Sequence, residues 1–511
     1  MSTQPFFSYK KLLDRIKDLI ILQNVQGILQ WDMETMMPPR AVKQRSQQLA
    51  LLSRIEHKMS TSLEIGRLIK RIKANSNYET LDLYQKRNLY LIEKNYEEQK
   101  SLPEKLIAEK TKQQVLTVNS WKKAKLRKDF SLLKPDLEKL VEIHKKIAEI
   151  LAKVKRVKTP YNALIDIYEP KISTQTVNRI FSQLQKGLEA LLKKIQNSSE
   201  YRPNQKNISL VATEKQKKIS QLLTRTLGYD TFSSNSGGRI DETEHPFTAG
   251  YFDDIRITTH YYPNDYLSSI FSILHETGHA ICEQNINQEF KYQPIGSIIS
   301  SGIHESQSRL YENIIGRSKE FWTYLFPKLK QIVSPQLENL SLNQFLLFIN
   351  HVKPSKIRIE ADEVTYNMHI LIRYQIEAAL FENKIEVNDL PEIWNQKYAD
   401  ILGLKIKNDA EGLMQDSHWA NGYYGYFPSY TIGNIYSGQI LKAIKKSVIN
   451  YKNKIAFGEL ADINQWLKEK VHSHGSLYDS NDLIKKISGE NITTQPYLHY
   501  LEEKYRELYN I

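Results

Sequence analysis

The feature that most constrains this chain is a helical spacing of apolar residues that continues over most of its length. From about residue 8 to 235, apolar residues recur at intervals of three and four, and Lys, Glu and Gln fill the polar faces. Segments 136–155, 173–198 and 361–383 predict long amphipathic helices. No repeat or linker divides the chain. We therefore expect an all-α, mainly helical body, residues 1–511 forming a single domain with two lobes around a groove.

One segment interrupts the helices. Gly237-Gly238-Arg239-Ile240-Asp241 breaks the helical pattern, and Ile255, Ile257 and Thr259 then alternate with Arg256 and Thr258. This predicts a small antiparallel β element near residues 237–260. An edge strand of such an element can pair with an extended peptide. A second irregular stretch, rich in Gly, Tyr and Pro, predicts a loop at 421–433.

Composition excludes several classes of protein. Lys and Arg number 71 against 58 Asp and Glu, a net charge of +13, but the excess is spread out and indicates a solvated surface, so we expect no nucleic-acid partner. The one cysteine, Cys282, allows no intrachain disulfide, and we interpret it as a packing residue in a reducing compartment. Charges interrupt every apolar run before it reaches the about 18 residues of a membrane span. We expect a cytoplasmic protein with no signal peptide and no membrane contact.

The chemistry is concentrated in His275-Glu276-Thr277-Gly278-His279. Leu267, Ile270, Leu274 and Ile281 form an apolar stripe through this segment, with Asn264 or Asp265 as its cap, so it is predicted to be a helix. Histidines at i and i+4 share a face and can bind one Zn²⁺, and Glu276 beside them can act as general base. The alternative is an ordinary helix with two half-exposed histidines. The interior Gly278 argues against it, because such a glycine usually has a packing reason.

Zinc needs a third protein ligand. The metzincin pattern would require Gly and His where Cys282 and Asn285 stand, and Glu283 lies one further turn along the same helix, displaced from the metal. We therefore look to a second helix, predicted around the adjacent His304 and Glu305. Spacing does not choose between these two, although the usual hydrolytic set of two His and one Glu favours Glu305. Co²⁺ and Mn²⁺ suit the same ligands and are alternatives to Zn²⁺.

These residues belong to an ordered series of motifs, and on them the chain resembles the thermostable (Taq-type) metallocarboxypeptidase family. The similarity runs from Trp31-Asp32-Met33-Glu34 to the loop after residue 420, with minor departures at Ser429 and Ser437. Besides the zinc helix, the motifs in family order are His245-Pro246-Phe247, Asp254-Ile255-Arg256-Ile257-Thr258, His304-Glu305-Ser306-Gln307, Ile357-Arg358-Ile359-Glu360-Ala361-Asp362 and Gly412-Leu413-Met414-Gln415-Asp416-Ser417-His418-Trp419.

The resemblance implies a helical oligopeptidase-like fold with zinc at the floor of a deep groove and Glu305 as the third ligand. It also implies a homodimer that releases single residues from peptide C-termini, with broad preference except for proline. Competing functions are an oligopeptidase that cleaves internally or removes dipeptides, and an inactive scaffold that keeps its metal for stability. Glu276 argues against the scaffold, because a structural zinc site needs no base.

Further residues are candidates for handling the substrate. His418 and a tyrosine, Tyr426 or Tyr430, are candidate donors to the developing oxyanion, although a Tyr-rich packing turn is the alternative. Arg358 is the candidate for binding the terminal carboxylate, oriented by Asp362 at i+4, unless the two form an ordinary surface pair. Arg256 and His245 are weaker candidates for binding substrate.

Overall fold

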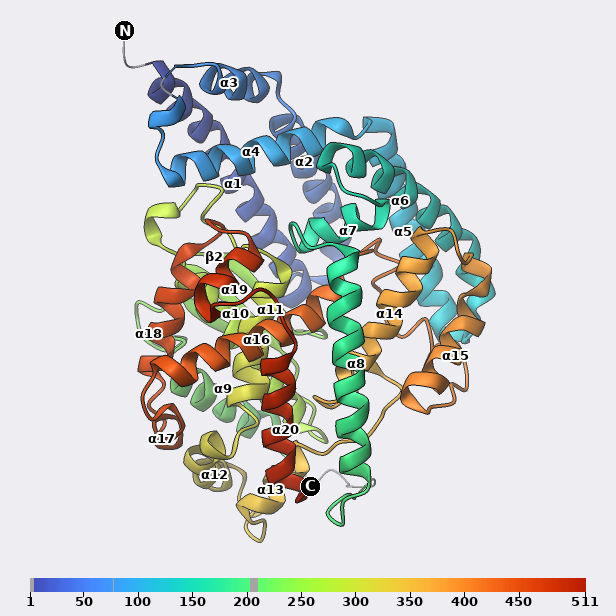
Figure 1. The fold of residues 1–511 in the computed structure, drawn as a ribbon, viewed down its shortest axis with the longest axis vertical. Helices are drawn as coiled ribbons and strands as arrows, with labels where there is room; N and C mark the ends of the chain where they lie inside the picture. Colours follow the sequence, from blue (N-terminus) through green and yellow to red (C-terminus); the bar gives the residue numbers. More distant parts are fainter. Residues whose placement is uncertain (1–3, 77, 203–209) are drawn as a thin grey trace.

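The computed structural model describes residues 4–76, 78–202 and 210–511, so residues 203–209, in the region predicted to be helical, lie outside the described part (Figure 1). The helical prediction is confirmed. The α-helices are α1 Gln4–Thr35, α2 Val42–Ser60, α3 Leu63–Lys73, α4 Leu83–Ser101, α5 Glu104–Arg127, α6 Lys134–Lys155, α7 Pro160–Tyr168, α8 Thr174–Gln196, α9 Thr213–Leu227, α10 Tyr266–Gln284, α11 Ser301–Arg309, α12 Lys319–Val333, α13 Leu342–Ile349, α14 Tyr366–Phe381, α15 Leu390–Leu402, α16 Pro428–Ser447, α17 Tyr451–Phe457, α18 Ala461–Lys470, α19 Ser480–Ser488 and α20 Gln495–Tyr509.

The three long helices predicted from spacing are α6, α8 and α14. Two helices, α14 and α16, start at other residues than the sequence predicted. α14 starts at Tyr366 and not at 361, because the Asp362 side chain accepts the N–H groups of Val364 and Thr365 and closes a turn before the helix. The loop predicted at 421–433 ends early. Pro428 is at the first turn of α16, a position that tolerates the missing proline N–H, so Tyr430 is helical.

The β element has three strands, β1 Gly238–Glu242, β2 Thr248–Tyr251 and β3 Asp254–Thr259, in the order β1-β3-β2. β2 pairs antiparallel with β3, with Thr248 opposite Ile257, as predicted. β1 pairs parallel with β3, with Gly238 opposite Ile255, so the sheet is mixed and not purely antiparallel. The chain reverses once between β1 and β2 and again between β2 and β3. Two reversals restore the original direction, and β1 occupies the edge of β3 that the β2–β3 hairpin leaves open.

Most helices contribute to one continuous apolar core, and a smaller core lies at the N-terminal end. Residues of α1, α3 and α4 form the smaller core, among them Leu12, Ile72 and Leu89, and Figure 1 shows α3 and α4 at one end of the molecule, from which α1 runs toward the middle. α2 contributes no buried residue and packs on α1. α11 packs against both α10 and α16 inside the large core, and these three helices position the site described next.

No helix in the described part of the chain has a stretch that is both long and apolar enough to cross a membrane.

Candidate metal centre

The two histidines lie on α10, as the sequence predicted. Asp265 caps the helix by accepting the N–H of Ser268 at 3.4 Å. Ile270, Leu274 and Ile281 are buried, while Leu267 is only partly buried. The helix is held by this stripe, so the rings of His275 and His279 are left on one face, with centroids 4.9 Å apart.

A carboxylate from α11 completes the group. Ser300 caps α11 by accepting the N–H of Ile303, and Glu305 lies one turn into the helix. Its Oε2 is 3.7 Å from Nε2 of His275 and 3.6 Å from Nε2 of His279. These separations are long for hydrogen bonds. They are close to the about 3.4 Å between ligand atoms around a tetrahedral metal with bonds of about 2.1 Å.

Among the described residues, His275, His279 and Glu305 are the group that could hold a metal ion in this way, with ligand atoms within 4.8 Å of one another. Glu283, the rejected ligand, and His304, the alternative to Glu305, are not part of this group. The ring of His304 lies tilted against that of His279, with centroids 3.9 Å apart, and its Nε2 is 3.4 Å from Oε1 of Glu283. The donor set therefore fits a hydrolytic metal site with Glu305 as the third ligand.

Two glycines allow these helices to approach so closely. A Cβ on Gly278 would lie 2.6 Å from the carbonyl oxygen of Gln307 and 2.7 Å from Cα of Ser308, both in the backbone of α11. A Cβ on Gly433 of α16 would lie 2.7 Å from Cβ of Glu305. Gly278 thus has the packing reason that its place in the helix indicated: α10 and α11 cross at this point.

A second carboxylate orients the first histidine. Glu312 lies in the π-helix Leu310–Ile315 (η5) that continues α11, and Nδ1 of His275 is 2.8 Å from its Oε2. Arg309 donates to both carboxylates, to Glu305 at 2.7 Å and to Glu312 at 3.1 Å. Burial alone would raise the pKa of Glu312, but the nearby Arg309 and His275 lower it to about 2. An ionised Glu312 holds the proton of His275 on Nδ1 and leaves Nε2 free for a metal.

Sequence reasoning missed Glu312 and Arg309. A signal was present, because Glu312 follows Glu305 by seven residues, two helical turns, and so returns to nearly the same face.

The proposed base, Glu276, is buried beside the sheet. Oγ1 of Thr248, on edge strand β2, donates to its Oε2 at 2.6 Å. Burial raises the pKa of Glu276, which favours proton acceptance. Thr248 was also missed, although it directly follows the His245-Pro246-Phe247 motif.

Arg358 is buried, but its partner differs from the predicted one. Its Nε and Nη2 donate to Oδ1 of Asp416 at 3.1 and 2.8 Å, and Nη1 donates to the Tyr366 hydroxyl at 3.0 Å. The orienting role predicted for Asp362 is wrong. Arg358 lies in the short helix Arg358–Glu360 (η6), separate from α14, so the i+4 relation within one helix does not apply.

Asp416 binds a second buried arginine that the sequence did not single out. Nε of Arg373, on α14, donates to Oδ2 at 2.7 Å. Burial alone would raise the pKa of Asp416, but the charges of Arg373 and Arg358 hold it well below its usual value. Asp416 therefore stays ionised and holds both guanidinium groups in place.

His418 and the two tyrosines form one cluster next to Arg358. Nε2 of His418 is 3.2 Å from the Tyr430 hydroxyl, the rings of Tyr426 and Tyr430 are 5.2 Å apart, and the Arg358 guanidinium lies 5.1 Å above the Tyr430 ring. Burial lowers the pKa of His418 to about 4, so its ring is neutral near pH 7. Burial, and to a smaller extent the negative charge of Glu305, raises the pKa of Tyr426 to about 12. Both tyrosines keep their protons and can donate.

The cluster adjoins the metal ligands through Tyr366. Its ring lies 4.5 Å from the guanidinium of Arg309, and its hydroxyl accepts from Arg358. Arg309 is the arginine bound to Glu305 and Glu312. The structure thus brings together the metal ligands, Arg358, His418 and both tyrosines.

It does not bring the two weaker candidates to this group. Arg256 is on the central strand, pairs with Asp254 and stacks on Trp31 of α1 at 4.4 Å. The contact with Trp31 attaches α1 to the sheet. His245 is exposed at a bend between β1 and β2.

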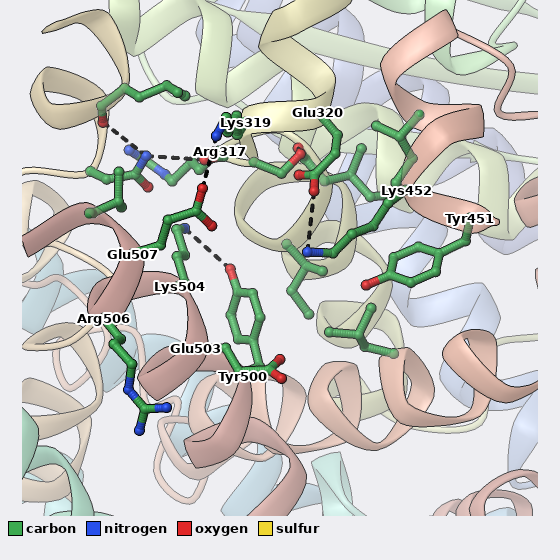
Figure 2. A pocket seen from close by; sticks show the side chains of 18 of the residues that line it. Arg317, Lys319, Glu320, Tyr451, Lys452, Tyr500, Glu503, Lys504, Arg506 and Glu507 are labelled. Carbon is green, nitrogen blue, oxygen red and sulfur yellow. Dashed lines mark hydrogen bonds and ion pairs between the residues drawn. The ribbon is translucent and has the colours of Figure 1, made fainter. Parts of the chain in front are cut away.

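A cavity of about 690 Å³ lies behind the π-helix and is distinct from this group (Figure 2). Leu310, Ile314, Leu346 and Leu441 are among the residues that line it, and none of the candidate site residues does. Much of its charged rim is paired within itself, as in Lys319 with Glu507 and Lys452 with Glu320.

The family model for carboxypeptidase Taq (M32) metallopeptidases matches residues 11–505. "Carboxypeptidase 1" of Bacillus subtilis is 37% identical over 98% of this chain and 98% of its own length. "Thermostable carboxypeptidase 1" of Pyrococcus furiosus is 35% identical over 97% of this chain and 98% of its own. The crystal structure of an M32 carboxypeptidase from Deinococcus radiodurans has a TM-score of 0.94 and 30% identity, covering 99% of this chain and 100% of its own. The predicted family is therefore confirmed, and the chain belongs to the carboxypeptidase Taq (M32) metallopeptidases, a family of peptide hydrolases.

Proposed function

We propose that this metallocarboxypeptidase binds one Zn²⁺ through His275, His279 and Glu305 and releases single residues from peptide C-termini with broad preference. The proposal rests on one observation: the candidate metal ligands and a buried arginine lie next to each other. A cluster of three metal-ligand side chains, with a buried carboxylate beside it, adjoins a buried arginine that is surrounded by tyrosine hydroxyls. Such a pair of groups suits hydrolysis next to a free carboxylate.

A zinc ion bound there would act as a Lewis acid and lower the pKa of a bound water. Glu276 would accept the proton of the attacking water and pass it to the leaving amine, with Thr248 keeping the carboxylate in place. His418 and the tyrosine hydroxyls, held neutral by burial, would donate to the oxygen on which negative charge develops. Either tyrosine can serve.

Arg358 would bind the free C-terminal carboxylate of the peptide, and this contact would make the enzyme require a free C-terminus. Nε and Nη2 are engaged by Asp416 and Nη1 by Tyr366, so the guanidinium is fixed and presents its stacked face toward Tyr430. A fixed guanidinium loses little freedom when it binds an anion. β2 is an edge strand beside Glu276 and would pair with the backbone of an extended peptide.

The test compares one peptide as the free acid and as the C-terminal amide, with metal analysis of the purified protein. We expect one zinc per chain, stepwise loss of single residues from the free acid, and little cleavage of the amide. Equal cleavage of both peptides would favour the oligopeptidase. Bound metal without cleavage of either would favour the inactive scaffold.

The homodimer, peptide partners and cytoplasmic location implied above stay predictions. Light scattering of the purified protein would test the dimer.

A further inference from the structure

A single buried carboxylate holds both ends of the segment that connects His418 to Tyr426. Oε1 of Glu377, on α14, accepts the indole N–H of Trp419 at 2.7 Å, and its Oε2 accepts the backbone N–H of Gly425 at 2.8 Å. Trp419 directly follows His418, and Gly425 directly precedes Tyr426. The carboxylate therefore contacts the immediate neighbour of each of the two candidate donors.

The third partner of Glu377 comes from outside this segment. The hydroxyl of Tyr161, on α7, donates to Oε2 at 2.8 Å. The Glu377 side chain is fully buried, with 0% of its surface exposed. A carboxylate in such a place is costly unless its oxygens accept hydrogen bonds, and here they accept three.

The segment has little room to move away from Glu377. Gly425 has a φ of 82°, and a Cβ there would lie 2.7 Å from the carbonyl carbon of Leu164 in α7. Trp419 is buried and meets the ring of Trp394 edge-on at 5.8 Å. The segment thus lies directly on α7 and α14. Glu377 of α14 accepts the hydrogen bonds that hold the segment there.

We propose that Glu377 is a positioning residue: by fixing Trp419 and Gly425 it orients His418 and Tyr426 beside the metal ligands. The inference rests on the proposed function, since the orientation matters only if His418 or Tyr426 contacts the substrate. If Glu377 were purely structural, its substitution would lower the stability of the protein and leave turnover by the folded fraction unchanged. If Glu377 is a positioning residue, its substitution lowers kcat itself.

Glu377→Gln is the informative variant. An amide has the same shape, but its nitrogen cannot accept a hydrogen bond. If the nitrogen replaces Oε1, Trp419 loses its acceptor, and if it replaces Oε2, Gly425 does. The Tyr161 hydroxyl can turn and accept instead. We expect kcat on a free-acid peptide to fall roughly 10- to 100-fold, as for a misplacement of about 1 Å. Bound metal stays the same and KM changes by less than about threefold.

Tyr161→Phe is the matched control. It removes a hydrogen bond of the same length to the same carboxylate, but not one that holds the segment. We expect kcat to stay within about threefold of the unmodified protein. An equal fall of kcat in both variants would overturn the inference, because the effect would then belong to Glu377 and not to the segment.

A double-mutant cycle separates this inference from the proposed function. His418→Ala alone should lower kcat roughly 100- to 1,000-fold, and in a protein that carries both His418→Ala and Tyr426→Phe, adding Glu377→Gln should cost little more, because Glu377 acts through these two side chains. If His418→Ala and Tyr426→Phe both leave kcat unchanged, the proposed roles of these residues fail and the inference fails with them. If His418→Ala lowers kcat and Glu377→Gln does not, or if Glu377→Gln costs as much in the protein that lacks both donors as it does alone, only the inference is overturned.

Should Glu377→Gln fail to fold, Trp419→Phe provides the same test. It removes one donor of the segment and leaves the carboxylate with Gly425 and Tyr161. We expect kcat to fall roughly 3- to 30-fold with bound metal unchanged. An unchanged kcat would overturn the inference.

Discussion

The two halves of the site are built differently. The metal half is local: His275, Glu276 and His279 share one helix, and Glu305, Arg309 and Glu312 follow one another on the next. The substrate half gathers side chains from η6, α14, the segment after Asp416 and the start of α16, and holds them through buried long-range ion pairs and hydrogen bonds. The contrast teaches that helical periodicity can place metal ligands, whereas the placement of arginine and tyrosine groups depends on distant partners.

The largest effect should come from the metal half, at the chemical step. Glu276→Gln keeps the side-chain shape but removes the base, so kcat should fall roughly 100- to 10,000-fold while bound metal stays at one per chain. Steady-state kinetics and metal analysis on the same sample measure both. Glu283→Gln, a carboxylate of the same helix outside the metal group, is the control and should have a much smaller effect. Full activity of Glu276→Gln would refute the mechanism.

The substrate half should respond next, through stability as well as binding. In Asp416→Asn the buried Arg358 and Arg373 lose their shared counter-charge, which should cost about 3–5 kcal/mol of unfolding free energy and raise KM for free-acid peptides. Chemical denaturation and kinetics measure these. Asp362→Asn, which leaves the Arg358 pair intact, should cost less and keep KM. If Asp362→Asn raises KM more than Asp416→Asn does, the role given to Asp416 in holding Arg358 would be refuted.

The same ion pairs should make the free energy of unfolding depend on pH in the acid range. The folded-state pKa of Asp416 lies below its usual value, so its contribution is fully present above the unfolded pKa of about 3.9 and is lost as the pH falls below it. The difference in unfolding free energy between the unmodified protein and Asp416→Asn should be constant from about pH 8 to 5 and shrink below about pH 4. A difference that grows in acid would contradict an ionised Asp416.

A smaller effect is expected from the residue that orients the first metal-binding histidine. Glu312→Gln should weaken metal affinity roughly 10- to 100-fold, because His275 loses the carboxylate that holds its tautomer. Competition with a chelator measures this. Glu320→Gln, whose carboxylate pairs with Lys452 at the rim of the separate cavity, is the matched control and should not change it. Unchanged affinity in Glu312→Gln would show that the helix alone orients the ligand.

The smallest effect should come from the sheet. Thr248→Ala removes one hydrogen bond to the base, and kcat should fall roughly tenfold with KM and metal content unchanged. Thr323→Ala removes a threonine hydrogen bond on the exposed face of α12 and serves as the control. A larger loss than in Glu276→Gln would mean that β2 does more than position the base.

Much of the site was predictable from the sequence, for a physical reason. The ligand helix with its cap at Asn264 or Asp265, and the second helix around Glu305, depend on spacing and capping within a few residues, which any helix of this pattern obeys. The position of Glu305 on a neighbouring helix followed from the exclusion of Glu283 and from the family resemblance.

Other features depended on contacts between residues far apart in the chain, which spacing along the sequence does not predict. The parallel pairing of β1 follows from two chain reversals, and the partner of Arg358 is 58 residues away in Asp416 and not four residues away in Asp362. Gly278 illustrates both levels. Its unusual place in a helix was visible in the sequence, but only the tertiary structure places its missing Cβ against the backbone of Gln307 and Ser308, where the two ligand helices cross. Local periodicity determined which side chains could bind a metal, and long-range packing decided which groups face them.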